Sequence, residues 1–258
     1  MSQFQQMPGT VLVTGAADRI GAAIARRLAM EGWAVIVHYR GSAGAAQAVV
    51  EDIVGQGGKA ALVQADLADR AQRAGLVAKA AQAFGPLTAL INNASIFKPD
   101  AVSDLDEALW DAHFAVHAEA PLFLARDFAV QLPQGTQGNI VNIIDERVLH
   151  LSPAFLSYTL SKSVLWTATQ TLAQSLAPAI RVNAIGPGPT LRHEGQSQAE
   201  FERSIDRLLL KRGATPQDIA AAVLFIFSAP AFTGQMLALD GGKHLEYPER
   251  RAPTPRQQ

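Results

Sequence analysis

Cysteine is entirely absent from this chain of 258 residues. Disulfides, thiolate metal sites and cysteine nucleophiles are therefore excluded. The chain also lacks an excess of charge of either sign. It has 22 lysines and arginines and 23 acidic residues, so its formal net charge is −1. With that balance, the sequence offers no electrostatic surface for nucleic acid or for an anionic membrane.

Long apolar runs and targeting signals are also lacking. No run approaches the roughly 20 residues that span a membrane. The first ten residues, MSQFQQMPGT, lack the basic and apolar regions of a secretory signal. We therefore expect a cytoplasmic protein. Charged residues make up only 17% of the chain and hydrophobic residues 48%, a balance that argues against disorder and supplies a large core.

What is present is an alternation of short β-rich runs with longer, alanine-rich helical runs. Strands are predicted at residues 10–14, 34–39, 60–64, 87–92, 139–144, 180–184 and 236–239, and helices at residues 19–31, 43–54, 70–84, 104–131, 155–176, 198–210 and 215–228. Continuous apolar strands between helices predict a parallel sheet covered on both faces. The predicted class is therefore α/β, a doubly wound sheet of about seven parallel strands in a single domain over residues 1–247. Residues 248–258 are rich in proline and arginine and are expected to form a disordered tail.

A glycine-containing turn, TGAADRIG, follows the first predicted strand and opens a helix. Such a turn lets backbone N–H groups at a helix N-terminus approach a pyrophosphate. Tight packing of the helix on the strand would also explain the two glycines, but the place of the turn in the alternating pattern favours a dinucleotide site. We expect Gly15, Arg19, Ile20 and Gly21 to contact this cofactor.

The end of the second predicted strand indicates which nicotinamide cofactor is used. An acidic residue there would bond the free 2′-hydroxyl of NAD, but the segment reads HYRGS and has none. Arg40 and Arg19 instead offer guanidinium groups that suit a 2′-phosphate. The alternative is that both arginines are solvated surface residues. We expect NADPH, with His38 and Arg40 in its binding site.

Tyr158 and Lys162 place a phenol and an ammonium four residues apart, hence on one face of a predicted helix. A free tyrosine, with a pKa of about 10, is a poor proton donor near neutrality, and an adjacent cation is expected to lower that pKa. The pair follows the fifth strand, and open α/β sheets bind ligands at the carboxyl ends of their strands. That place favours a catalytic pair over a surface pair.

Together these motifs resemble the short-chain dehydrogenase/reductase family from about residue 10 to residue 242. Further matches are Asp66-Leu67, Asn92-Asn93-Ala94, Asn183 and Pro187-Gly188. The resemblance implies a Rossmann fold and a homotetramer or homodimer. It also implies cofactor contacts from Asp66 and Leu67 near the adenine, Asn92, Ala94 and Ser95 along the cofactor, Lys162 on the nicotinamide ribose, and Pro187 and Gly188 beside the nicotinamide.

Three positions depart from the usual family pattern. Asp145 replaces a serine thirteen residues before Tyr158, Arg19 replaces the middle glycine of the first turn, and His117 replaces an asparagine on the central helix. Asp145 and Arg19, with NASIF at residues 93–97, resemble the pteridine reductases. His117, with DGGKHL at residues 240–245, resembles the bacterial dihydromonapterin reductases.

This resemblance implies an NADPH-dependent reductase that transfers hydride to a C=N bond of a dihydropterin. Asp145, Tyr158 and Lys162 would be catalytic, with Tyr158 supplying or relaying a proton to the ring nitrogen. An aspartic acid buried beside a phenol is expected to hold a proton part of the time and to donate it. The alternatives are a short-chain reductase of an unrelated small carbonyl compound and a non-catalytic, cofactor-binding scaffold.

Substrate contacts are expected from Ser95, Phe97, Asp145, Tyr158, Thr190 and Arg192. Phe97 is predicted to stack on the pterin ring, with ordinary core packing as the alternative. Residues 190–198 form a polar segment expected to be a mobile lid, although such loops also collect unrelated variation. No metal is expected, because His113 and His117 have a zinc-like spacing but lack a third ligand. Both are expected to line the pocket or lie at the surface.

Overall fold

The structure, a computed structural model, describes residues 8–193 and 195–246. These residues form one sheet of seven parallel strands in the order β3-β2-β1-β4-β5-β6-β7. The strands are β1 (Thr10–Val13), β2 (Ala34–Tyr39), β3 (Lys59–Gln64), β4 (Leu87–Asn92), β5 (Gly138–Ile143), β6 (Ile180–Pro187) and β7 (Met236–Leu239). The predicted doubly wound α/β class is confirmed. The tail predicted at residues 248–258 lies outside the described residues.

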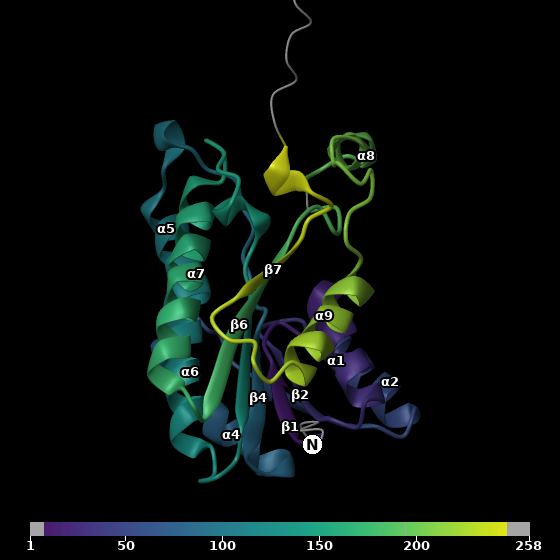
Figure 1. Cartoon of the computed structure of the whole chain (residues 1–258), viewed down its shortest axis with the longest axis vertical. Helices are drawn as coiled ribbons and strands as arrows, with labels where there is room; N and C mark the ends of the chain where they lie inside the picture. Colours follow the sequence, from purple (N-terminus) through teal and green to yellow (C-terminus); the bar gives the residue numbers. More distant parts are fainter. Residues whose placement is uncertain (1–7, 194, 247–258) are drawn as a thin grey trace, which may run out of the picture.

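Helices cover both faces of the sheet (Figure 1). One face carries α1 (Arg19–Met30), α2 (Ala43–Gly55) and α9 (Pro216–Ser228), and the other carries α4 (Leu76–Phe84), α5 (Glu107–Phe114), α6 (Ala120–Gln131) and α7 (Leu156–Leu176). The short helices are α3 (Arg70–Arg73) and α8 (Gln198–Asp206), with 3₁₀ turns η1 (Val102–Asp104), η3 (Glu146–Val148) and η4 (Lys243–Leu245) and a π-helical turn η2 (Ala115–Glu119).

The core lies on both sides of the sheet because successive strand residues point to opposite faces. In β1, Val11 and Val13 join a fully buried cluster with Ile219 of α9, whereas Leu12 joins the opposite cluster with Leu124 and Phe128 of α6. Since both faces are covered, the central strands consist largely of apolar residues. This continuity is what made them recognisable in the sequence.

Two predicted helices are interrupted, each at an identifiable residue. The helix expected at residues 70–84 breaks at Gly75, whose φ of 80° is a left-handed conformation that glycine adopts readily. The helix expected at residues 104–131 starts only at Glu107, where the Asp106 carboxylate accepts the Leu109 N–H at 2.8 Å. It then widens into η2, because Pro121 has no N–H to give to the carbonyl four residues earlier.

Two other boundaries differ from the prediction. Strand β6 continues to Pro187 rather than ending at residue 184, because it pairs with β7 as far as the contact between Pro187 and Leu239. Helix α8 ends at Asp206 rather than at residue 210, and the chain then turns through Lys211, which has a φ of 52°.

The strands remain parallel, but the direction in which the chain adds new strands to the sheet changes between β1 and β4. The chain leaves β1 towards β2 and β3 but leaves β4 towards β5, so the loops that follow β1 and β4 diverge and open a crevice at the carboxyl ends of the strands. Asn93 holds the base of this crevice together. Its side-chain Nδ2 donates to the carbonyls of Thr14 and Gly15, at 2.9 and 3.0 Å.

Candidate active site

The three predicted catalytic side chains meet at the carboxyl end of β5. Asp145 precedes η3, while Tyr158 and Lys162 lie one turn apart near the start of α7. The Tyr158 hydroxyl donates to Asp145 Oδ2 at 2.8 Å. Lys162 Nζ donates to the carbonyl of Ile143 at 2.8 Å and lies 5.7 Å from the centre of the Tyr158 ring. A phenol, a carboxyl group and an ammonium therefore share one cluster.

The Asp145 carboxyl group is surrounded by donors. Besides the Tyr158 hydroxyl, its Oδ1 accepts the backbone N–H of Arg147 at 2.9 Å and Arg147 Nη1 at 3.3 Å. Both carboxyl oxygens of Asp145 therefore accept hydrogen bonds, and Oδ1 accepts one of them from a guanidinium. That this acid holds a proton part of the time stays a prediction.

The ionisation of Tyr158 also differs from the sequence-based expectation. Burial raises the pKa of Tyr158 well above its ordinary value, and the charge of Asp145 and its hydrogen bond raise that pKa further. The ammonium expected to lower the pKa is turned towards the Ile143 carbonyl. Burial lowers the pKa of Lys162 itself to about 8, against the opposing charge of Asp145. The site thus holds a protonated phenol beside a lysine that can lose its charge.

A neutral imidazole connects the loop after β4 to the catalytic helix. His117 is buried in η2, and its Nε2 accepts the N–H of Ile96 at 3.0 Å and lies 3.0 Å from Ser95 Oγ. The ring proton is therefore on Nδ1, which donates to Ser161 Oγ at 2.9 Å. Burial lowers the pKa of His117 well below 6.5, with the charges of Lys162 and His113 adding to the effect. His117 is thus a buried structural link rather than a surface residue.

Ser95 and Phe97 lie in the irregular loop of residues 93–101, which follows β4. The Phe97 ring meets the Tyr158 ring edge-on, with centroids 4.8 Å apart and planes at 88°. Ser95 is exposed beside His117. The structure therefore brings both predicted substrate residues next to Tyr158.

The turn after β1 has the shape expected of a dinucleotide site. A Cβ added at Gly15, where φ is 60°, would lie 2.8 Å from Ala94 Cα, so only glycine fits. Arg19 also has a left-handed φ, of 51°, at the position where the family resemblance expects glycine. Within the described residues, no side chain caps α1, so the first N–H groups of this helix remain open to an anion.

Arg19 spans the crevice to the loop that follows β6. Its guanidinium donates to the carbonyl of Arg192 at 3.1 Å and to that of Leu191 at 3.4 Å. The Arg192 guanidinium donates to the carbonyl of Gln196 at 3.1 Å, within its own loop, and the Thr190 hydroxyl donates to the carbonyl of Gly188. The predicted lid residues therefore lie opposite the glycine turn.

His38 lies beneath the glycine turn. Its Nδ1 accepts the Gly15 N–H at 3.1 Å and its Nε2 donates to the carbonyl of Ala65 at 3.1 Å. Burial lowers the pKa of His38 to about 4, so the ring is neutral. Because both ring nitrogens bond within the protein, His38 shapes the turn and has no donor left for a phosphate. Arg40 stands exposed at the same edge of the sheet.

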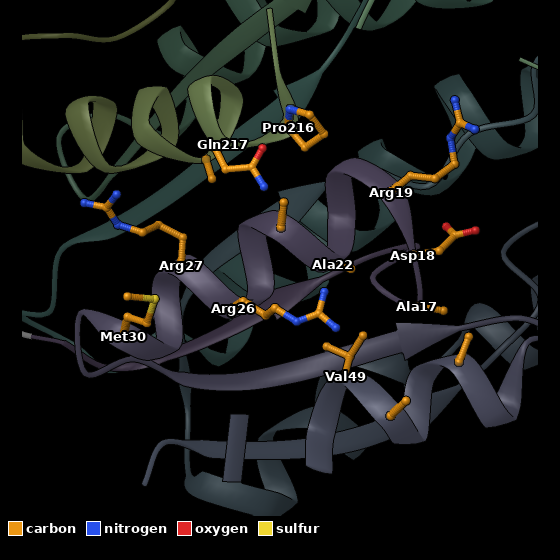
Figure 2. A pocket seen from close by; sticks show the side chains of 14 residues that line it. Ala17, Asp18, Arg19, Ala22, Arg26, Arg27, Met30, Val49, Pro216 and Gln217 are labelled. Carbon is orange, nitrogen blue, oxygen red and sulfur yellow. The ribbon is translucent and has the colours of Figure 1, made fainter. Parts of the chain in front are cut away.

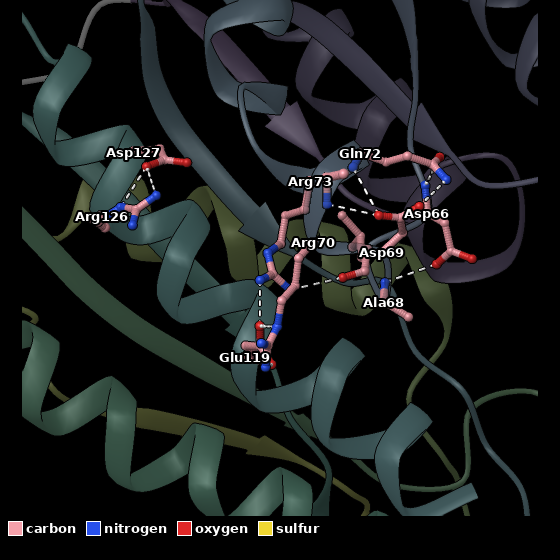
Figure 3. Close-up of polar contacts among 11 residues, drawn as sticks. Asp66, Ala68, Asp69, Arg70, Gln72, Arg73, Glu119, Arg126 and Asp127 are labelled. Atoms are coloured by element: carbon pink, nitrogen blue, oxygen red, sulfur yellow. Dashed lines mark hydrogen bonds and ion pairs between the residues drawn. The ribbon is translucent and has the colours of Figure 1, made fainter. Parts of the chain in front are cut away.

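The loop after β3, which contains Asp66 and Leu67, is fixed by ion pairs (Figure 3). Arg73 is almost fully buried and donates to the carbonyl of Leu67 at 3.1 Å. Arg73 and Arg70 both bind the carboxylate of Glu119, at 2.6 and 2.7 Å. Since Glu119 ends η2, the loop expected at the adenine is tied to the turn that contains His117.

The remaining predicted cofactor residues stand at the ends of β4 and β6. Asn92 is buried and donates to Asn142 Oδ1 at 2.8 Å. The N–H of Ala94 donates to Thr14 Oγ1 at 3.0 Å. Pro187 ends β6, and a Cβ added at Gly188 would lie 2.7 Å from Asp240 Cα. These residues flank β5 and the cluster at its end.

A hollow of about 730 Å³ opens elsewhere, between α1, α2 and α9 (Figure 2). Its lining includes Arg19, Arg26 and Arg27 but none of the catalytic cluster. Arg26 forms an ion pair with Asp52 at 2.5 Å and Arg27 forms one with Glu31 at 3.0 Å, so both guanidinium groups already have an acidic partner. We therefore assign the functional site to the crevice and not to this hollow.

Within the described residues, no three histidine, cysteine or acidic side chains gather to hold a metal ion. His113 and His117, despite their spacing, each bond a serine hydroxyl. None of the described helices combines the length and the hydrophobicity needed to span a bilayer.

Sequence reasoning missed three side chains of the site. Ser161 bonds His117, Arg147 pairs with Asp145, and Phe155 stacks on Phe97. Helical spacing does not indicate Phe155, because it precedes α7 in a left-handed conformation. No pattern in the sequence indicates Arg147.

The chain is similar to known proteins over nearly its whole length. A family described as enoyl-(acyl carrier protein) reductase matches residues 15–244. Crystal structures of FolM alternative dihydrofolate reductase 1 with NADP, from Brucella canis and Brucella suis, superpose with TM-scores of 0.91 and 0.90. They are 46% and 49% identical to this chain. The superpositions include 99% and 95% of this chain, and 99% and 97% of the respective Brucella chains. The 3-oxoacyl-[acyl-carrier-protein] reductase FabG of Staphylococcus epidermidis is 30% identical over 244 residues. The match covers 93% of this chain and 100% of the FabG sequence.

Proposed function

This chain belongs to the short-chain dehydrogenase/reductase family, and on that premise we propose that it reduces a C=N bond of a dihydropterin to give a tetrahydropterin. The predicted family, oxidoreductase class and use of NADPH are confirmed by its relatives. The pterin substrate and the roles of individual residues are the proposed part.

The residues of the crevice fit NADPH. Gly15, Ile20 and Gly21 belong to the close turn and the uncapped start of α1, which suit a pyrophosphate. Arg19 and Arg40 suit the 2′-phosphate, since no acid follows β2. The other proposed cofactor contacts are His38 through the turn it shapes, and Asp66, Leu67, Asn92, Ala94, Ser95, Lys162, Pro187 and Gly188.

We expect Arg40→Asp to lower the ratio of kcat/KM for NADPH to kcat/KM for NADH about a hundredfold. A hydrogen bond to a charged group contributes about 1.5–3 kcal/mol, and the new carboxylate repels the phosphate while accepting a 2′-hydroxyl. Initial rates with both cofactors measure this ratio. Lys59→Asp, at the other end of the sheet, makes the same change of charge as a control. An unchanged ratio in Arg40→Asp would remove this residue from the phosphate site.

The observation that carries the substrate proposal is the carboxylate of Asp145, bonded to Tyr158 and paired with Arg147. A serine in this position, as family members usually have, offers a hydroxyl that donates. A carboxylate only accepts, and a pterin ring presents amino and ring N–H groups that donate to it. The FolM relatives at 46% and 49% identity are named as dihydrofolate reductases, which also act on a pterin ring.

The ionisation of the cluster suits protonation of a ring nitrogen. When bound, NADPH would supply a hydride to the ring carbon, and the adjacent ring nitrogen would then be strongly basic. The Tyr158 O–H then breaks and an N–H forms; because the pKa of this phenol is raised, its proton stays in place until so strong a base develops. Asp145, with a side chain 15% exposed, links Tyr158 to solvent for its reprotonation, and Lys162 is proposed to hold the nicotinamide ribose.

The substrate ring is proposed to lie between the cluster and the Phe97 loop. Phe97 offers a flat face beside Tyr158, and Ser95 offers a hydroxyl next to it. Thr190 and Arg192 of the loop opposite the glycine turn are proposed to contact the part of the substrate that extends from the ring.

NADPH consumption by the purified protein tests the proposal. The substrates are dihydromonapterin, dihydrobiopterin, dihydrofolate, a 3-oxoacyl thioester and simple ketones. Turnover confined to the pterins supports the proposal, and the order of kcat/KM among them names the substrate. Turnover of carbonyl compounds alone would instead favour the second candidate, a carbonyl reductase, which the similarity to FabG supports.

A non-catalytic scaffold is separated from both enzymes by thermal unfolding. Saturating NADPH must raise the melting temperature if the crevice binds it, since a ligand of the folded state stabilises that state. A raised melting temperature without turnover of any substrate would favour the scaffold.

We expect kcat/KM for NADPH to fall as the pH rises through about 8. The folded-state pKa of Lys162 lies below its ordinary value, so its ammonium is fully charged below about pH 8 and is lost above it. This parameter reports ionisations of the free protein. Lys162→Arg keeps its charge and should be less active without this decline. A decline of the same shape in Lys162→Arg would contradict the assignment.

We also propose that the protein forms a homodimer or homotetramer. Leu160 and Val164 of α7 are 41% and 40% exposed, and with Trp110 of α5 they line an apolar hollow of about 600 Å³. A second copy would remove this face from water. Analytical ultracentrifugation at micromolar concentration should show a dimer or a tetramer. A single monomeric species would contradict the proposal. The cytoplasmic location stays a prediction.

A further inference from the structure

Phe155 immediately precedes α7, the helix that contains Tyr158 and Lys162, and its backbone has a conformation that phenylalanine disfavours. Its φ of 60° and ψ of 46° are left-handed, where a Cβ is strained and glycine is the usual residue. Residues that precede a helix are ordinarily extended and cap it with a short polar side chain, and Phe155 does neither. Strain of this kind persists where the surrounding structure over-determines it, and it gathers at functional sites.

The capping role falls to Asp100, from the loop that contains Phe97. The Asp100 carboxylate accepts the N–H of Ser157 at 3.2 Å and also the Ser157 hydroxyl, and its backbone carbonyl accepts the N–H of Leu156 at 3.2 Å. The end of this loop is therefore anchored to α7 without any contribution from the Phe155 side chain. The side chain of Phe155 is free for another role.

That side chain is stacked on Phe97. The two ring centroids are 4.4 Å apart with planes at 18°, and the Arg147 guanidinium lies 4.9 Å from the Phe155 centroid and 5.3 Å from the Phe97 centroid. Phe97 has no regular secondary structure to hold it, so its ring is placed by these contacts, by the edge of Tyr158 and by the His193 ring, whose centroid is 5.3 Å away. Phe155 supplies the broadest of these ring contacts, because its ring is nearly parallel to that of Phe97.

We propose that Phe155 is a positioning residue, whose left-handed backbone places its ring against Phe97 and so sets the orientation of the face on which a flat substrate ring stacks. Arg147 holds the same stack from a third side while pairing with Asp145. One guanidinium thereby ties the stacking face to the carboxylate of the catalytic cluster. The inference rests on the proposed function for the flatness of the substrate.

The test compares Phe155→Leu, which keeps bulk without a flat ring, with Phe155→Gly, which accepts the left-handed backbone. We expect both to raise KM for a dihydropterin about tenfold, the range of one aromatic pair, with kcat and KM for NADPH within about twofold of wild type. Phe155→Tyr keeps the stack and should restore KM. Lys211→Gly, which changes another left-handed residue with a φ of 52°, should leave KM unchanged.

A double variant tests whether Phe97 is the intermediary. In a Phe97→Leu background, Phe155→Leu should raise KM no further, because two residues that act through one contact are not additive. An additive effect would overturn the inference. So would wild-type KM in Phe155→Leu and Phe155→Gly.

A crystal structure of Phe155→Gly separates this inference from the proposed function. We expect the Phe97 ring to leave its present orientation in this variant while Tyr158 and Lys162 keep theirs. If wild-type protein reduces no pterin, the proposed function fails, yet a displaced Phe97 ring still supports the positioning role. A Phe97 ring that keeps its place overturns that role whatever the substrate is.

Discussion

Tyr158→Phe is expected to lower kcat for the dihydropterin about a thousandfold, within the range of a positioned general acid. The change removes one hydroxyl and keeps the ring, which meets His117 and Phe97 edge-on at 5.2 and 4.8 Å. Folding and cofactor binding should therefore survive, and the loss should fall on the chemical step.

Single-turnover oxidation of NADPH measures that step directly, and the melting temperature at saturating NADPH shows whether the cofactor still binds. Ser175→Ala is the matched control. It also removes one hydroxyl from α7, but at the far end of the helix, where the hydroxyl donates to the carbonyl of Thr171. A Tyr158→Phe variant with kcat within tenfold of wild type would exclude the phenol as the proton donor.

Asp145→Ser, which installs the residue that the family usually has, is expected to lower kcat/KM for the dihydropterin about a hundredfold. The serine hydroxyl cannot accept as a carboxylate does, and Arg147 loses its ion pair, so the variant forfeits charged hydrogen bonds that contribute about 1.5–3 kcal/mol each. Turnover of a simple ketone, if the wild type shows any, should fall far less. Equal losses on both substrates would mean that Asp145 serves the fold rather than pterin recognition.

Asp145→Asn separates the charge of this residue from its shape. The amide keeps one acceptor oxygen without the charge, so its kcat/KM should lie between wild type and Asp145→Ser. A second readout is the ionisation of Tyr158, followed by ultraviolet absorbance. The charge and hydrogen bond of Asp145 raise the pKa of this phenol, so both variants should lower it. Pterin turnover unchanged in both variants would remove Asp145 from the mechanism.

Much of the fold was predictable because burial leaves a pattern in the sequence. A strand covered on both faces is mainly apolar, as β1 is, and this pattern predicts the seven strands. The breaks within helices were not recognised, because each depends on one residue. Gly75 permits a left-handed turn, and Pro121 withholds one N–H, while the surrounding residues remain good helix formers.

The candidate site was predictable as a group of residues but not as a set of interactions. Helical spacing places Tyr158 and Lys162 on one face, and strand order brings Asp145 beside them. The direction in which Lys162 Nζ points depends on the Ile143 carbonyl, a contact between elements that local patterns do not contain. The expected lowering of the pKa of Tyr158 failed because burial and the charge of Asp145 both raise that pKa. The supporting role of His38 likewise depends on contacts between elements, which local patterns do not contain.

The π-helical turn at Ala115–Glu119 gives the two flanking helices different tolerances to a change in length. A π turn closes its hydrogen bonds over five residues rather than four, so it holds one residue more than an α-helical turn. Deleting a residue of this turn would leave an ordinary α-helical turn, and the flanking helices would keep their orientation. A residue inserted within α6 has no such turn to absorb it, and it would rotate Phe128 out of the core by about 100°.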